Sequence, residues 1–255
     1  MGPLSGEQLV TQLLTPVDLS TLRLLRGAGW EFDDILRVFV KSINGIRNAT
    51  TAASATPEGV PQYAKFLEIA DAIDELEDEG MLGISQVKGE QGVKTILQIS
   101  RAGRKTQHFQ TLVDIIHLDA DAEFYTMDLG VYKSGALSSD LLVDTRPILA
   151  SMFYLGQSIE FPPDLINSGV VNVSYDQQGE PFDWGPVFDG LMSIKVSRNK
   201  PKNSFVAVDY KGLWYFVDNT DIASKETLSM LSMLIALKAG GKVKADPILT
   251  LPVGG

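Results

Sequence analysis

The clearest periodic pattern in the chain lies between Glu31 and Arg47, where apolar side chains recur at the spacing of one helical face. Two aspartates stand near the start of this segment and an arginine at its end, as the helix dipole favours. The pattern therefore predicts one helix over Glu31–Arg47. Shorter helices are predicted over Glu7–Leu14 and Asp18–Arg26, with Pro16 between them.

The segment Asn48–Pro61 is small, polar and poor in apolar residues, so we expect an exposed loop there. A second long helix is predicted over Gln62–Glu79, where the helical spacing returns. Two strands joined by a glycine-containing turn are predicted over Met81–Val87 and Val93–Ser100. Another helix is predicted over Arg104–Leu118.

From Glu123 onward the pattern changes to short segments typical of strands. The last two of these strands are separated only by Lys211-Gly212, which is a strong hairpin signal. The predicted strands are Glu123–Leu129, Leu141–Asp144, Leu191–Val196, Ser204–Tyr210 and Leu213–Asp218. Helices are predicted over Pro147–Ile159 and Asp221–Leu237, and a short edge strand over Asp246–Val253.

Strands and helices do not alternate regularly, which disfavours a doubly wound parallel sheet. The sequence predicts an α+β fold in which an antiparallel or mixed sheet is packed with helices and preceded by a helical N-terminal region. Residues 1–60 form that helical region and its loop, and residues 61–255 form the α+β domain. We expect the two to make one continuous globular unit.

Composition narrows the classes of function. The chain has 22 basic and 32 acidic residues and a net charge of -10, so it lacks the basic footprint of a nucleic-acid-binding protein. It has no cysteine, which excludes disulfides, thiolate nucleophiles and iron–sulfur clusters. No run of about 18 apolar residues occurs, so no transmembrane segment is expected.

The motifs of cofactor and nucleophile chemistry are missing. Gly27-Ala28-Gly29 lacks the third glycine of a dinucleotide site, and no phosphate-binding loop occurs, so no cofactor is expected. His108 and His117 would lie on opposite faces of their predicted helix, and no metal site is expected from them. Ser85 and Lys88 match the first element of the penicillin-interacting enzymes, but its companion motifs are absent.

Carboxylates near predicted strand ends leave one enzymatic alternative open. A hydrolase acting on carbohydrate or peptidoglycan needs two acids that flank one bond, and aromatic side chains that stack on a sugar. Trp184 and Trp214 are candidates for that stacking, although packing in the core and within the hairpin explains Trp214 better, because aromatic residues are favoured in strands. The candidate acids are Asp144, Asp183, Asp189, Asp209 and Asp218.

The predicted helix Gln62–Glu79 carries a run of acidic residues that crowds its C-terminal turn, where the helix dipole disfavours negative charge. A basic protein partner or a divalent cation would offset this cost, whereas a solvated acidic face would simply tolerate it. The run comprises Glu68, Asp71, Asp74, Glu75, Glu77, Asp78 and Glu79. The candidate surface for a partner or cation is Glu75, Glu77, Asp78 and Glu79.

A second candidate site is the junction Asp144-Thr145-Arg146-Pro147, where a predicted strand leads into a helix. Arg146 and Asp144 together form a possible contact for an anion or a carboxylate. The alternative is a local ion pair between the two side chains that only fixes the turn.

Three segments resemble stretches of a group of uncharacterised bacterial proteins that are often predicted to be lipoproteins. Phe205–Gly240 is similar in its aromatic-rich hairpin, its Asp-x-x-Ser-Lys helix start and its leucine-rich helix, and Thr145–Pro162 and Ser42–Asn48 are similar to other stretches. The resemblance implies a lipidated cysteine upstream of this sequence, and hence a lipid anchor and a location in the cell envelope or periplasm. A cytoplasmic location is the alternative.

These observations together predict a non-catalytic bacterial envelope protein that acts as a protein-binding or assembly component. The expected partner is another protein. The alternative function is the hydrolase with a dispersed carboxylate site.

Overall fold

The computed structural model describes residues 6–49, 60–89, 92–130, 139–169, 171, 174–175 and 179–239. Its described part combines helices with two mixed sheets and begins with helices, so the predicted α+β class and helical N-terminus are confirmed. The predicted edge strand at 246–253 and most of the predicted loop at 48–61 lie outside the described residues. None of the described helices is long and apolar enough to cross a membrane.

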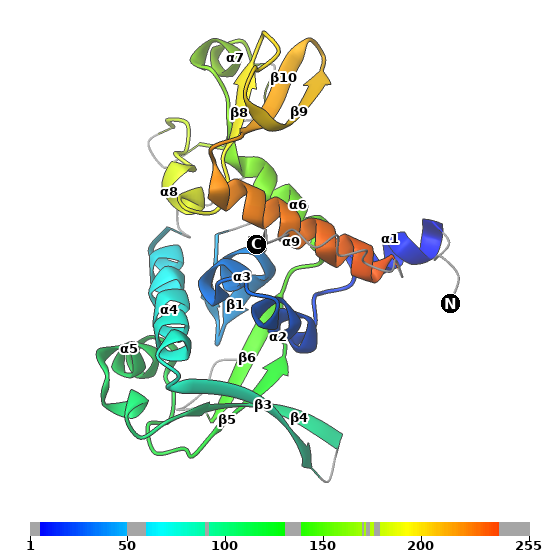
Figure 1. Cartoon of the computed structure of the whole chain (residues 1–255). Helices are drawn as coiled ribbons and strands as arrows, with labels where there is room; N and C mark the ends of the chain where they lie inside the picture. The colour runs from blue at the N-terminus through cyan, green and yellow to red at the C-terminus, as the bar shows by residue number, and fades with distance from the viewer. Residues whose placement is uncertain are drawn as a thin grey trace, which may run out of the picture.

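A six-stranded sheet occupies the lower end of the molecule in Figure 1. Its order is β2-β1-β6-β5-β4-β3, and the β5–β6 pair is parallel while the other pairs are antiparallel. The strands are β1 (Val40–Ile43), β2 (Ile46–Arg47), β3 (Leu82–Gly89), β4 (Gly92–Ile99), β5 (Tyr125–Leu129) and β6 (Asp140–Thr145).

Helices from the first half of the chain pack beside this sheet and on one another (Figure 1). They are α2 (Leu19–Gly27), α3 (Phe32–Phe39), α4 (Val60–Asp78) and α5 (Gln107–Ile116), with a 3₁₀ turn at Gly103–Lys105 before α5. Their apolar faces form one core with the sheet, in which Phe39, Phe66 and Leu76 are completely buried. Burial of this apolar surface is the main stabilising contribution to the fold.

A smaller sheet of order β7-β8-β10-β9 lies at the opposite end of the molecule, and α6 and α9 lie between the two ends (Figure 1). Its strands are β7 (Ile159–Glu160), β8 (Ile194–Ser197), β9 (Ser204–Tyr210) and β10 (Leu213–Asp218). The remaining helices are α1 (Gly6–Leu14), α6 (Ile148–Leu155), α7 (Pro163–Asn167), α8 (Gly185–Phe188) and α9 (Ile222–Lys238), with a 3₁₀ turn at Gly156–Ser158.

The predicted hairpin and the predicted start of the last helix are both confirmed. Lys211 and Gly212 have positive φ angles of 53° and 77°, as a two-residue hairpin turn requires. The carboxylate of Asp221 accepts a hydrogen bond from the Ser224 N–H at 3.0 Å and caps α9. The helix predicted over Pro147–Ile159 is shorter than expected, because α6 ends at Leu155 and Ile159 begins β7.

The prediction of one helix over Glu31–Arg47 is wrong in its second half. The helix α3 ends at Phe39, and the chain continues as the hairpin β1–β2. The reason is the dipeptide Asn44-Gly45, whose φ angles of 44° and 84° form the turn between the strands. Asparagine and glycine tolerate positive φ better than other residues, so this turn overrides the apolar helical period around it.

Asn44 also joins the hairpin to the rest of the sheet. The side chain is 6% exposed, and its Oδ1 accepts a hydrogen bond from the Leu142 N–H of β6 at 2.8 Å. Its Nδ2 donates to the carbonyl oxygen of Ile116, at the end of α5, at 3.2 Å. One side chain therefore holds a turn, a strand and a helix end together.

We expect Asn44→Ala to lower the free energy of unfolding by about 2–4 kcal/mol, because alanine disfavours the left-handed backbone and leaves buried hydrogen-bonding groups without partners. Urea denaturation measures the change. Asn199→Ala, at an exposed position of the small-sheet end, is the matched control and should change stability by less than about 0.5 kcal/mol. Equal losses in the two variants would contradict the role assigned to Asn44.

Candidate functional site

The acidic C-terminal end of α4 forms ion pairs with a basic side chain of the same chain. Arg26 of α2 donates from Nε to the Glu77 carboxylate at 2.7 Å and from Nη2 to the Asp78 carboxylate at 2.5 Å. Glu75 and Glu79 are exposed, and in the described residues neither pairs with a basic side chain. The predicted surface of four acids is thus divided into two carboxylates that pair with Arg26 and two solvated ones.

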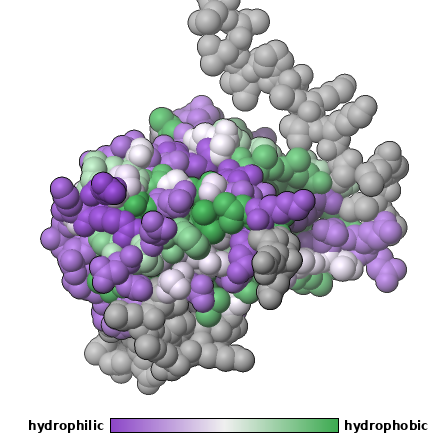
Figure 2. All heavy atoms as spheres, turned by 90° about the horizontal axis from the view of Figure 1, so that it is seen from below, coloured by the Kyte–Doolittle hydropathy of each residue, from purple (hydrophilic) through white to green (hydrophobic). Residues whose placement is uncertain are grey.

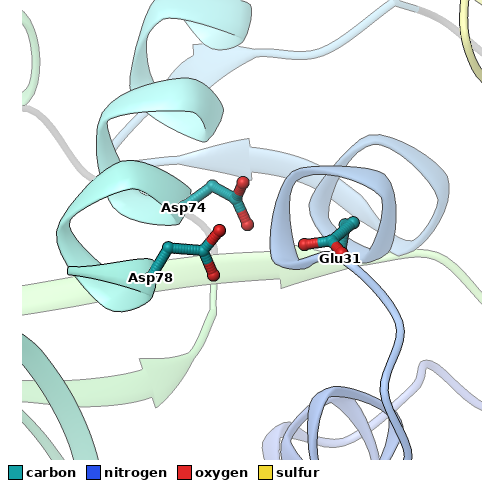
Figure 3. Close-up of side chains that lie close together, drawn as sticks. All are labelled: Glu31, Asp74 and Asp78. Atoms are coloured by element: carbon teal, nitrogen blue, oxygen red, sulfur yellow. The ribbon is translucent and has the colours of Figure 1, made fainter. Parts of the chain in front are cut away.

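Three carboxylates near this point lie close enough together to suggest a cation site. Oxygens of Glu31, Asp74 and Asp78 all lie within 4.8 Å of one another, and Figure 3 shows Asp74 and Asp78 of α4 directed toward Glu31. However, the Asp74 carboxylate accepts hydrogen bonds from the backbone N–H groups of Phe32 at 2.8 Å and Asp33 at 3.3 Å. Since Asp78 is paired with Arg26, capping of α3 and ion pairing explain the cluster without a metal ion.

A second acidic group surrounds Arg37 on α3. Asp33 and Asp34 lie 3.8 Å and 3.5 Å from its guanidinium nitrogen. Burial is the main effect that raises the pKa of Asp34 to about 7, and the negative charge of Asp33 adds to it while Arg37 opposes it. Glu226 of α9 and Glu31 raise the same pKa further.

The structure places the two residues of the predicted anion contact in different surroundings. Arg146 is 1% exposed, and its guanidinium donates hydrogen bonds to the backbone carbonyl oxygens of Arg37 at 2.9 Å and Val38 at 3.1 Å. Asp144 instead pairs with Lys41 of β1 at 2.9 Å. Arg146 is thus out of reach of a carboxylate on another protein, and burial lowers its pKa to about 10.

A pocket of about 890 Å³ brings together three of the residues considered for the hydrolase alternative. Asp183, Trp184 and Asp189 line it, with Glu160 and Asp221 from elsewhere in the chain. Asp209 and Trp214 face each other across the β9–β10 hairpin, outside the pocket lining. The pocket itself was not predicted, because it forms only when folding brings three distant segments together. These are Gln157–Glu160, Phe182–Ser193 and the start of α9.

Sequence reasoning also missed the outer edge of β9. This strand ends the small sheet, and its large apolar side chains are exposed, with Val208 at 57% and Tyr210 at 58%. The signal in the sequence was that apolar residues follow one another without a polar residue between them, so that both faces of the strand are apolar. The face seen from below in Figure 2, at the other end of the molecule, instead carries many hydrophilic side chains with hydrophobic areas between them.

Comparisons with known proteins add no relative. No protein-family model matches the chain, and neither the curated proteins nor the solved structures include a match. The chemistry of the described residues is therefore the basis on which a function can be proposed.

We expect Arg146→Lys to lower the free energy of unfolding by about 2–4 kcal/mol, because an ammonium group cannot reproduce the planar fork that reaches several carbonyl oxygens. Urea denaturation measures the loss. Arg47→Lys, at an exposed position of β2, is the matched control and should leave stability nearly unchanged. A loss in Arg146→Lys no larger than in the control would show that the buried hydrogen bonds contribute little.

We expect Asp34→Asn to stabilise the protein in a pH-dependent way. Because the folded pKa of Asp34 is about 7, above the value of 3.8 that the unfolded chain has, folding retains a proton and wild-type stability falls as pH rises from 4 to 7. The free energy of unfolding of Asp34→Asn lacks this fall. The variant should therefore be about as stable as wild type at pH 4 and more stable by about 1–3 kcal/mol above pH 7. Thermal or urea unfolding across this pH range, with Glu79→Gln as the exposed control, measures it. A pH-independent difference would contradict the assignment.

Proposed function

We propose that this protein is a non-catalytic component of the bacterial envelope that binds another protein by adding an extended segment of that partner to β9. The observation that carries the proposal is the exposed apolar edge of the small sheet. A free strand edge offers a row of backbone donors and acceptors to an incoming strand, and pockets between its side chains give selectivity.

The other described sheet edges have features that protect against such pairing. The strands β2 and β7 contain two residues each, which is too short to guide a partner. The strand β3 is longer but carries Gly83, Ser85, Gln86 and Lys88 among its residues. By contrast, β9 has seven residues and exposes Phe205, Val206, Val208 and Tyr210.

The turn geometry fixes which backbone groups of β9 are free. Tyr210 and Leu213 flank a two-residue turn, so they form a hydrogen-bonded pair across the hairpin. Because backbone groups alternate in direction along a strand, Val208 also bonds toward β10, whereas Ala207 and Asp209 direct their N–H and C=O groups outward. An added strand would therefore bond to Ala207 and Asp209.

The charge around this edge defines the chemistry of the partner segment. From Asn199 to Lys211, a segment that contains β9 and the residues flanking it, there are three basic residues and one acidic one, giving +2 in a chain whose net charge is -10. In the described residues, the lysines at 200, 202 and 211 form no ion pair with a carboxylate. A partner segment with alternating apolar residues and acidic flanks complements both the strand and its surroundings.

The envelope location is supported by the resemblance to predicted bacterial lipoproteins and not by the comparisons. It predicts that the mature native protein starts with a lipid-modified cysteine. Mass spectrometry of the native N-terminus tests this part separately, and an unmodified N-terminus would overturn it.

The hydrolase alternative is favoured by one observation, the pocket that gathers Asp183, Asp189 and Trp184. We prefer the protein-binding function over the hydrolase, because the acids of the pocket already take part in local hydrogen bonds. The Asp183 carboxylate accepts one from the Gly185 N–H at 2.9 Å. Likewise, Glu160 accepts one from Ser193, and Asp221 caps α9. These acids are thus held by turns, caps and neighbouring hydroxyls.

The test uses a synthetic peptide of about eight residues that alternates valine with glutamate, and measures its binding by fluorescence anisotropy and amide NMR shifts. We expect roughly micromolar affinity, with the largest shifts along β9. Ala207→Pro, which removes one outward N–H, and Val208→Glu, which places a like charge against the glutamates of the peptide, should each weaken binding at least about tenfold. Val87→Glu, the same change on the edge strand β3, is the matched control.

The outcomes separate the possible occupants of the edge. Peptide binding that Val208→Glu and Val87→Glu reduce equally would overturn the assignment to β9. A wild-type dimer in light scattering that becomes a monomer in Ala207→Pro would show that a second copy of this chain, and not another protein, occupies the edge.

A further inference from the structure

The pocket at the small-sheet end has the size and lining of a ligand site. Its volume of about 890 Å³ falls in the range of sites for small molecules. The turn before β7, the segment around α8 and the first turn of α9 enclose it. It is separate from the outer edge of β9, because none of the residues of β9 lines it.

Aromatic side chains form part of the wall. The rings of Phe182 and Trp184 meet edge to face with centroids 4.8 Å apart, and Trp184 lies 5.9 Å from the buried ring of Phe188. Trp184 is only partly buried, so it can present ring surface to the pocket. Such a surface attracts both apolar chains and cations.

The charged groups of the lining are all negative. Carboxylates come from four residues, and no lysine, arginine or histidine lines the pocket. In the described residues, none of these four side chains forms an ion pair. They are Glu160, Asp183, Asp189 and Asp221.

The serine hydroxyls of the lining are already committed as donors within the protein. Ser158 Oγ donates to the carbonyl oxygen of Leu155 at 2.7 Å, and Ser193 Oγ donates to the carboxylate of Glu160 at 2.5 Å. Ser224 Oγ donates to the carboxylate of Asp221 at 2.6 Å. The wall therefore offers mainly acceptors, so a ligand that fits must bring the donors.

The positive charge of Arg37, which lies behind the wall, is compensated. Arg37 donates to the backbone carbonyl oxygen of Asp189 at 2.7 Å from the core side. Its charge is balanced by Asp33 and Asp34, which lie within 4 Å of it. Arg37 therefore does not offset the negative charge of the pocket carboxylates.

We propose that this pocket binds an organic cation, a primary ammonium group carried on a short apolar chain such as a lysine side chain. An ammonium group has three N–H donors and no acceptor, which matches a lining of carboxylates. The face of Trp184 takes the cation and its methylene stem together. A neutral sugar needs donors as well as acceptors and is matched less well.

The test titrates the whole chain with N-acetyl-lysine methylamide and with N-acetyl-norleucine methylamide, which has a similar stem without the charge. Calorimetry and the indole N–H resonance of Trp184 report binding. We expect saturable binding of the lysine compound, at least about tenfold tighter than that of the norleucine compound, and weakened by added salt. Asp189→Asn and Trp184→Ala should each reduce affinity about five- to twentyfold.

Two controls make the result decisive. Glu75→Gln, at an exposed acid on α4, removes the same charge far from the pocket and should leave affinity unchanged. Trp184→Phe keeps an aromatic ring and should retain more binding than Trp184→Ala, which separates loss of the wall from loss of folding. The proposal is overturned if Glu75→Gln weakens binding as much as Asp189→Asn does, or if the norleucine compound binds equally well. Tighter binding or cleavage of a neutral chitin oligosaccharide would overturn it as well.

Discussion

The structure depends on how the backbone carbonyl groups at the C-terminal end of α3 are hydrogen-bonded inside the protein. A helix leaves its last carbonyl groups without helical partners, and here α3 turns directly into β1, so these groups lie in the core. Arg146 supplies its guanidinium and its backbone N–H to them, while the side chains of Asn48 and Ser151 supply the remaining donors. A positive charge at this end also matches the helix dipole. The accepting carbonyl oxygens are those of Arg37, Val38, Phe39 and Val40.

The same arginine connects this helix end to both halves of the molecule. Its carbonyl oxygen accepts a hydrogen bond from the Val17 N–H, which ties the segment between α1 and α2 to the end of β6. Its guanidinium lies 4.0 Å from the ring centroid of Tyr154 on α6. That ring packs on Phe188 of α8 at 4.9 Å, and Phe188 lines the pocket. A continuous set of contacts therefore runs from the six-stranded sheet to the wall of the pocket, so the pocket is built on the rigid core and not on a detached loop.

Local signals in the sequence were sufficient for most elements and failed where two signals competed. The hairpin at Lys211-Gly212 and the start of α9 were predicted because turn and capping residues agree with the apolar pattern around them. At Asn44-Gly45 the turn signal opposed a helical period, and the turn prevailed because tertiary hydrogen bonds of Asn44 support it. The role of Arg146 could not be predicted, since its acceptors lie about a hundred residues earlier in the chain. The acids and aromatic rings of the pocket likewise come from three separate segments.

Unpaired charges of opposite sign occur at the same end of the molecule, and the sheet order explains why they do not neutralise one another. The pocket lies beside β7, which contributes Ile159 and Glu160, whereas Lys200, Lys202 and Lys211 lie in the segments that precede and follow β9. With the order β7-β8-β10-β9, two strands separate these edges, so they stand three strand spacings or roughly 14 Å apart. This exceeds the screening length of about 8 Å at physiological ionic strength. The negative pocket and the positive strand edge can therefore attract different ligands independently, although a single small sheet carries both.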